Sequence, residues 1–223
     1  NAVFSLDSLN GVFLKNSTEA IWQLQPVAYG INTIEGPAFI PPPTGVGPNN
    51  PITLGSGLLS SFEPGDKRLT NWVGSLKPDG TLVTYYYPYK YKINTYGAAV
   101  NEYEMVLRLG EQYLIKAEAE AQLGDLSNAA TDLNSIRNRA GLPNTTSSTQ
   151  PSLLAAIQQE RRVELFSEWG HRWLDLKRTG TIDAVMNIAA PLKGATWDTR
   201  HQLYPISNYE LLNDPKLIQN PGY

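Results

Sequence analysis

Residues 160–178 read ERRVELFSEWGHRWLDLKR, and this stretch places charged residues inside an apolar helical stripe. The preceding sequence predicts the helix, because Thr149 closes a Thr/Ser-rich loop and is suited to cap it. We expect the helix to run from about residue 150 to residue 169, with apolar residues recurring at helical spacing from Leu153 to Leu165. A stripe of this kind indicates a helix with one face in the core.

Arg161, Glu164 and Glu168 lie within that stripe, close to the angular position of Ile157. An isolated charge in a protein core is very costly, so charges on a core-facing stripe must be paired. We therefore predict a structural ion-pair network in which Arg161 neutralises the two glutamates beside it. This network would brace the helix against its neighbours.

Arg172 and Asp175 stand three residues apart and are expected to extend the same network. The alternative is that Glu164 and Glu168 are the two catalytic carboxylates of a glycoside hydrolase, which in retaining enzymes lie about 5–5.5 Å apart. The placement of Arg161 between them favours the structural interpretation. We predict no catalytic residue and no enzyme activity, and keep the hydrolase as the less favoured hypothesis.

Two more helices joined by a tight turn are predicted upstream. The first spans residues 106–123 and ends at Gly124, after which Asp125 can cap the second, over residues 126–140. Their apolar stripes contain the small residues Gly110, Ala117, Ala121, Ala129 and Ala130. Small facing residues let two helices approach closely, as in a tetratricopeptide-type hairpin.

Residues 1–100 differ in character from residues 101–223. They hold 11 of the 18 Gly and 10 of the 16 Pro, and residues 36–62 contain no charged residue. This composition predicts a long ordered loop, with short strands near residues 19–25 and 81–87. We therefore divide one continuous domain into a loop-rich part, residues 1–100, and a helical part, residues 101–223.

Aromatic residues in the loop-rich part are the best candidates for binding a ligand. Sugar rings present C–H faces that pack on aromatic rings, while neighbouring amides hold the hydroxyls. On this chemistry we select Trp72, Tyr85 and Tyr87, with Asn71 as the polar neighbour. In a strand Tyr85 and Tyr87 share one face. The competing interpretation is that at least one face of this strand is simply core.

The composition excludes several other functions. The net charge of −3 and the isoelectric point near 5.4 provide no basic field for nucleic acid. The sequence contains no Cys, and its histidines, His171 and His201, have no recognisable metal spacing. We therefore predict no metal and no cofactor. No apolar run approaches the roughly 18–20 residues that cross a bilayer.

The stretch 160–178 resembles the ER-x-x-EL…EG-x-R-x-x-DL-x-R block of the SusD/RagB family, with Trp169 between Glu168 and Gly170 as a one-residue variation. Other blocks of that family are matched in the correct order. Residues 108–119 resemble its R-x-x-E-x-YLI-x-AEA helix, residues 134–141 its N-x-IR-x-RAG segment, and residues 203–223 its terminal LPIP…QNPGY sequence, with Ser207 in place of the second Pro.

Weaker similarities extend the resemblance toward residue 16. Glu19 with Ile21 and Trp22 is similar to the family's N-x-E-x-IF strand, Asp66 and Arg68 to its D-x-R motif, and Lys90 and Tyr91 to its KY pair. The resemblance implies a mainly α, SusD-like fold. A tetratricopeptide-type helical hairpin and a third helix would carry long irregular loops and a few short strands.

The same resemblance implies the function. Members of the family bind starch, other glycans or related nutrients at the bacterial cell surface and pass them to a SusC-type TonB-dependent transporter. They serve polysaccharide utilization, are usually about twice as long as this chain, and are outer-membrane lipoproteins anchored by an N-terminal Cys. We therefore expect the chain to be the C-terminal half of such a protein, without the lipid anchor. A tetratricopeptide-like protein-interaction scaffold is the main alternative.

Overall fold

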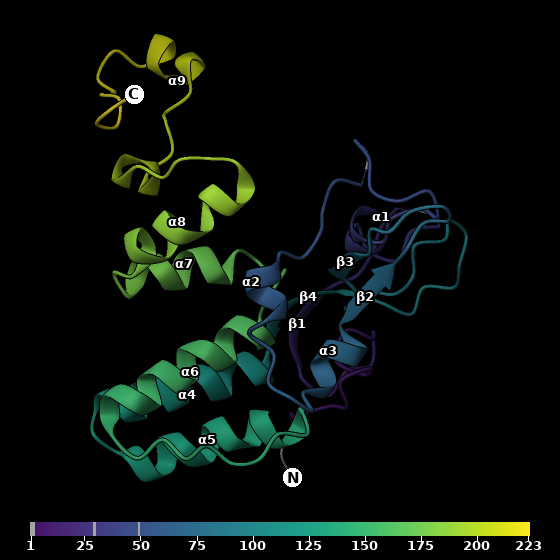
Figure 1. The fold of residues 1–223 in the computed structure, drawn as a ribbon, viewed down its shortest axis with the longest axis vertical. Helices are drawn as coiled ribbons and strands as arrows, with labels where there is room; N and C mark the ends of the chain where they lie inside the picture. Colours follow the sequence, from purple (N-terminus) through teal and green to yellow (C-terminus); the bar gives the residue numbers. More distant parts are fainter. Residues whose placement is uncertain (1–2, 29, 49) are drawn as a thin grey trace. The chain divides into compact units, whose positions relative to one another are not determined.

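The computed structural model describes residues 3–28, 30–48 and 50–223 (Figure 1). The chain divides into two compact units, Asn1–Trp169 and Gly170–Tyr223, called unit 1 and unit 2 below. The loop-rich and helical parts that differ in composition therefore lie largely within one compact unit. The predicted mainly α fold is confirmed, with short strands only in unit 1 among the described residues.

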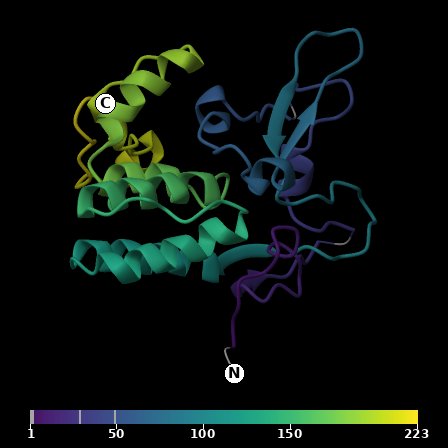
Figure 2. The ribbon, with the colours of Figure 1, turned by 60° about the horizontal axis from the view of Figure 1, so that its bottom comes forward.

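Three helices form the helical layer of unit 1 (Figures 1 and 2). They are α4 (Leu109–Gln122), α5 (Leu126–Arg139) and α6 (Gln150–Glu164). The turn between α4 and α5 forms as predicted, because Gly124 adopts a φ of +85° and Asp125 accepts a hydrogen bond from the backbone N–H of Asn128. The core between them consists of Leu114, Ala117, Ala121, Ala129, Leu133, Ile136, Leu153 and Ile157.

The predicted ends of two helices are wrong. Helix α6 starts at the predicted cap, Thr149, but ends at Glu164 and not near residue 169, because Ser167 and Trp169 have φ values of 54° and 41° in the left-handed region. Helix α4 begins at Leu109 and not at residue 106, because the residues before it pair as a strand with β1.

The loop-rich part of unit 1 contains two antiparallel strand pairs. Strand β1 (Ala20–Leu24) pairs with β4 (Glu104–Arg108), and β2 (Val73–Leu76) pairs with β3 (Tyr85–Pro88). Short helices α1 (Glu35–Phe39), α2 (Ser56–Leu59) and α3 (Lys67–Asn71) interrupt the loops. A second core joins this part to the end of α6 through Leu9, Val12, Phe13, Phe62, Trp72, Tyr91, Met105, Val163 and Phe166.

Unit 2 is built from short helices around an aromatic cluster. The helices are α7 (His171–Arg178), α8 (Ile182–Ala189), η1 (Pro191–Lys193), η2 (Thr199–Gln202) and α9 (Asn208–Asn213). The Trp173 ring lies 6.0 Å from the Trp197 ring and 6.2 Å from the Tyr204 ring. Asp183 accepts hydrogen bonds from Trp197 Nε1 and Gln202 Nε2, at 2.7 and 2.9 Å. In the part of the chain described, no helix is both long and apolar enough to span a bilayer.

Candidate functional site

Glu164, the last residue of α6, lies at the centre of a buried charge cluster in unit 1. One carboxylate oxygen, Oε2, lies 3.0 Å from Arg68 Nη1, and the other, Oε1, lies 2.6 Å from Arg108 Nη1. Arg139 pairs with Oε1 as well. Since these arginines come from α3, from the end of β4 and from the end of α5, one carboxylate joins segments that are far apart in the sequence.

Glu168 joins the same cluster from the turn after α6. Its Oε2 lies 2.8 Å from Arg108 Nε, and its Oε1 pairs with Lys90 Nζ. The Lys90 ammonium also donates to the carbonyl oxygens of Glu164 and Phe166, each at 2.8 Å. Lys90 therefore fixes both the second carboxylate and the backbone that follows the helix.

Further charged residues complete the cluster. Glu160 lies 2.6 Å from Arg68 and 3.2 Å from Arg137, and Arg68 pairs with Asp66 at 2.8 Å. The ion-pair cluster, as named from here on, consists of Glu19, Asp66, Arg68, Lys90, Arg108, Arg137, Arg139, Glu160, Glu164 and Glu168. Arg137 also pairs with Glu63 at 2.6 Å, toward the surface. The buried charges of the cluster are thus each paired with opposite charges, as burial requires.

Sequence reasoning missed most of the cations in this cluster. It assigned the neutralisation of both glutamates to Arg161, which is buried and has interactions of its own. The structure adds Arg68, Arg108, Arg139 and Lys90 as partners. The signal was present, because each of these residues stands in a block that resembles the SusD/RagB family, but spacing along one helix does not reveal partners on other elements.

Electrostatics keep both glutamates ionised. Burial alone would raise the pKa of Glu164, but the charges of Arg139, Arg108 and Arg68 hold that pKa well below its ordinary value. Burial also opposes ionisation of Glu168, and Arg108 and Lys90 nevertheless lower its pKa. The residues are 0% and 8% exposed. A glycosidase needs one protonated carboxyl and access for substrate. This geometry provides neither.

The prediction that Trp72 is a platform for a ligand is wrong. It is 0% exposed, and its Nε1 donates a 2.7 Å hydrogen bond to the carbonyl of Leu9. Lys90 Nζ lies 4.8 Å from the ring centroid, and Arg139 lies 5.7 Å away. The ring is thus enclosed by the core and by cations of the ion-pair cluster, so it has no face to offer a ligand.

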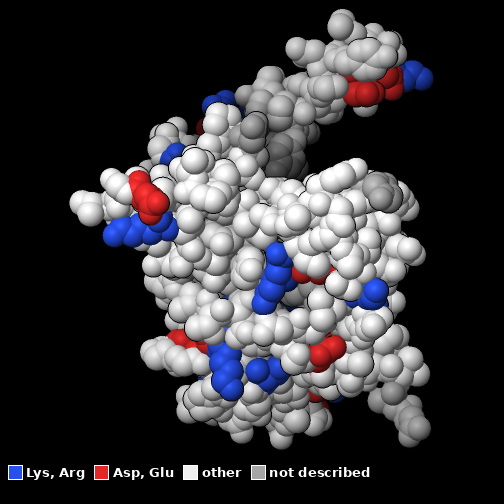
Figure 3. Space-filling model, turned by 90° about the vertical axis from the view of Figure 1, so that its right-hand side faces the viewer, with Lys and Arg blue, Asp and Glu red and all other residues white. Residues whose placement is uncertain are grey.

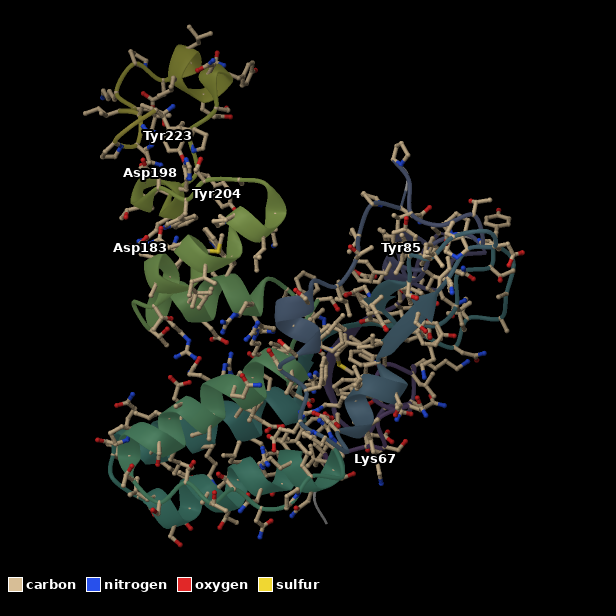
Figure 4. All side chains as sticks on the ribbon, in the orientation of Figure 1. Lys67, Tyr85, Asp183, Asp198, Tyr204 and Tyr223 are labelled. Atoms are coloured by element: carbon tan, nitrogen blue, oxygen red, sulfur yellow. The ribbon has the colours of Figure 1, made fainter. Side chains whose placement is uncertain are left out.

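The other predicted ligand residues lie nearer the surface. Asn71 ends α3, where its side chain donates to the Lys67 carbonyl at 2.7 Å and accepts from Asn10 at 2.8 Å. Tyr85 and Tyr87 share one face of β3, where the Tyr87 ring covers the backbone of Gly74. Figure 4 labels Tyr85 in the loop-rich part and Lys67 on α3. Both tyrosines are half-buried, so their assignment to a ligand stays a prediction.

Arg172 and Asp175 lie in α7 of unit 2, whereas the ion-pair cluster belongs to unit 1. Asp175 is 5% exposed and pairs with Arg178 at 2.8 Å, one turn along the same helix. The pair accounts for a local brace in α7. The predicted continuity with Glu164 and Glu168 stays a prediction.

Comparison with known families gives a clear match. The sequence profile of the SusD family, named SusD_RagB, matches residues 56–223. Two SusD-like proteins of Formosa agariphila are similar over about half of this chain. The protein called P38 is 36% identical over 128 residues, and the one called P25 is 32% identical over 133 residues. Each match covers 53% of this chain and 24% of the relative.

Solved structures resemble the whole chain. A surface glycan-binding protein A from Bacteroides uniformis superposes with a TM-score of 0.74 at 24% identity, over 99% of this chain and 53% of that one. A SusD superfamily protein from Bacteroides vulgatus reaches a TM-score of 0.80 at 20% identity, over 99% of this chain and 55% of that one. At these identities the likeness establishes the fold, and this chain spans about half the length of those proteins.

Proposed function

Because the chain belongs to the SusD/RagB family, we propose that it forms part of a non-catalytic protein that binds glycans or related nutrients at the bacterial cell surface. The protein would be held at the outer membrane by a lipid anchor and would deliver its ligand to a SusC-type TonB-dependent transporter. The protein of the same fold from Bacteroides uniformis is a surface glycan-binding protein, which supports the ligand class.

The state of Glu164 and Glu168 is the observation that carries the non-catalytic part of the proposal. Both carboxylates are buried and paired with cations, and both have lowered pKa values. A carboxyl in this state cannot give a proton to a leaving group near neutral pH. We therefore assign the two residues to the stability of unit 1.

The loop-rich side of unit 1 is the surface that suits a glycan. Residues 36–62 contain no charge, and Figure 3 shows this side with Lys, Arg, Asp and Glu scattered over an otherwise uncharged surface. An uncharged surface with tyrosines matches a ligand of hydroxyl groups and C–H faces. Tyr85 and Tyr87 stay the aromatic candidates there, with Asn71 as a polar neighbour.

The scaffold alternative uses the helical hairpin to hold a peptide. The face between α4 and α5 is filled by α6, since Leu153 and Ile157 are fully buried against that hairpin. A peptide could therefore bind only on the outer faces of the hairpin. The glycan hypothesis does not need a free face on the hairpin and is preferred.

Calorimetric titration of the chain with a panel of neutral and acidic oligosaccharides, with mass spectrometry of the mixture after prolonged incubation, tests the proposal. We expect saturable heat with at least one sugar and no shorter products. Release of shorter sugars by the pure protein would contradict a non-catalytic role. Binding of peptides with no binding of any sugar would favour the scaffold.

A further inference from the structure

A cavity of about 450 Å³ opens on the loop-rich part of unit 1. Its volume falls within the range of about 300–1,000 Å³ that is typical of small-ligand sites. Two loops far apart in the sequence supply its walls, one before α1 and one before β4. The residues lining it are Pro26, Val27, Ala28, Gly30, Gly97, Ala98, Ala99 and Val100.

Hydrogen bonds hold the two walls together. The backbone N–H of Gly97 donates to the carbonyl of Gly30 at 2.8 Å. Asn32 is 2% exposed and bridges the loops on its own: its amide donates to the Ala99 carbonyl at 3.2 Å, and its oxygen accepts from the backbone N–H of Asn101 at 2.8 Å. The cavity is therefore formed before any ligand arrives, which lowers the entropic cost of binding.

An exposed aromatic ring stands beside the cavity. Tyr96 is 72% exposed, and its ring lies over Gly30, so closely that a Cβ at Gly30 would stand 3.0 Å from the ring carbon Cζ. Gly30 has a φ of +75°, which allows the loop to turn beneath the ring. A large ring left so open in a loop, next to an apolar hollow, provides a stacking surface at low conformational cost.

The walls carry no charged side chain among the residues that the structure describes. They offer methyl and methylene groups together with backbone polar groups. Lys15 Nζ donates a 3.0 Å hydrogen bond to the carbonyl of the wall residue Val100. A second cavity, of about 360 Å³, is different, because Glu63, Asp66 and Lys67 line it.

We propose that the cavity lined by residues 26–28, Gly30 and residues 97–100 is a subsite for one uncharged sugar ring, which stacks on Tyr96 while its hydroxyls bond to the backbone of these wall residues. This assignment rests on the proposed glycan-binding function. It adds a place for a sugar ring away from the tyrosines of β3. The described wall residues have no charged side chain, and the Lys15 ammonium is already bonded to the Val100 carbonyl, so neutral sugars bind here in preference to uronates.

Substitution of Tyr96 tests the subsite. With the oligosaccharide that binds best in calorimetry, Tyr96→Ala should weaken the affinity about tenfold or more, as truncation of a central aromatic contact does. Tyr96→Phe keeps the ring and should bind within about threefold of the unchanged chain. The control is Tyr209→Ala, which removes a ring of α9 that is 73% exposed and belongs to no proposed site; it should retain binding.

A matched pair of glycine substitutions distinguishes an effect of the Tyr96 ring on affinity from an effect of backbone strain. Gly30→Ala places a methyl against the Tyr96 ring, whereas Gly80, with a similar φ of +73°, has no atom within 4 Å of an added Cβ. Both substitutions impose the same backbone strain. We expect Gly30→Ala to lose affinity and Gly80→Ala to keep it.

The outcomes distinguish the two proposals. If the unchanged chain binds none of the sugars, the proposed function fails. If it binds a sugar and Tyr96→Ala binds equally well while Tyr85→Ala does not, the subsite is wrong and the function stands. Tighter binding of a uronate than of the matching neutral sugar, lost on Tyr96→Ala, would overturn the preference for an uncharged ring.

Discussion

At the scale of single residues, the ion-pair cluster explains why charges stand in the apolar stripe of α6. Glu164 is 0% exposed and touches cations from α3, β4 and α5. Such a carboxylate costs free energy to desolvate and regains it only when every partner is in place. The ionised Glu164 is therefore stable only when α3, β4 and α5 are packed in their native places around it.

Glu164→Gln removes the charge and leaves the arginines around it without their shared partner. We expect the free energy of unfolding to fall by about 3–5 kcal/mol, the usual cost of breaking a buried ion pair. Chemical denaturation monitored by tryptophan fluorescence measures it. Glu210→Gln, at an exposed position of α9, is the control and should change stability by less than about 0.5 kcal/mol. Equal stability of both variants would contradict the bracing role.

The environment of Glu104 predicts that the stability of the chain falls as the pH rises. Burial raises the pKa of Glu104 to about 9, and a hydrogen bond to Glu35 and the charge of that residue add to the effect. The folded chain therefore keeps a proton that the unfolded chain releases above its ordinary pKa of 4.5. The stabilisation is complete below pH 4.5 and is lost progressively as the pH rises to about 9.

Glu104→Gln should remove this loss, because an amide keeps a hydrogen bond to Glu35 without titrating. We expect the variant to gain stability over the unchanged chain as the pH is raised from 5 to 9, as read from denaturation midpoints. Midpoints that stay parallel across this range would show that Glu104 is ionised in the folded chain at neutral pH.

At the scale of elements, the first turn of α4 requires glycine at position 110, because charged side chains leave no room for a Cβ. A Cβ at Gly110 would stand 2.6 Å from Arg108 Nη1 and 3.0 Å from Glu19 Oε2. Alanine normally stabilises a helix by about 1 kcal/mol relative to glycine. Here the added methyl would meet the ion-pair cluster, so the packing cost outweighs the gain in helix propensity.

Gly110→Ala should therefore lower the melting temperature, although helix propensity alone predicts a rise. Gly57 in α2 provides the comparison, because its added Cβ would meet only Arg162 Nη2 at an ordinary 3.5 Å. Thermal melts of both variants should show a loss for Gly110→Ala and little change or a gain for Gly57→Ala. A gain in both would mean that the cluster yields to the methyl.

Local signals predicted the elements better than their ends. The caps Thr149 and Asp125 and the turn at Gly124 were readable because capping and left-handed glycine depend on a few neighbouring residues. The end of α6 was not, because Ser167 takes a left-handed φ that its residue type does not favour. In the turn after α6, Glu168 pairs with Lys90 and Arg108, which come from distant parts of the sequence. The local sequence therefore does not predict the backbone of this turn.

For the molecule as a whole, function too is predicted only in part, because local sequence does not reveal contacts between distant residues. Blocks of matching residues predicted the family, and the match over residues 56–223 confirms it. Aromatic composition could not separate a core ring from a surface ring. Aromatic chemistry predicts Trp72 as a platform, but Trp72 is buried, whereas Tyr96, which the composition does not single out, is exposed. Burial depends on contacts across the chain, such as that between Trp72 and Leu9, which spacing does not encode.

Glu164 and Glu168 are ionised braces of unit 1 and not acid catalysts. Carbon-13 NMR titration of the side-chain carboxyls, assigned with Glu164→Gln and Glu168→Gln, measures this directly. We predict that the Glu164 and Glu168 signals stay those of ionised carboxylates from pH 8 downward until the chain unfolds in acid, because nearby cations lower both pKa values. A protonation of either carboxyl between pH 5 and 7 in the folded chain would contradict the claim and return the pair to the candidates for acid catalysis.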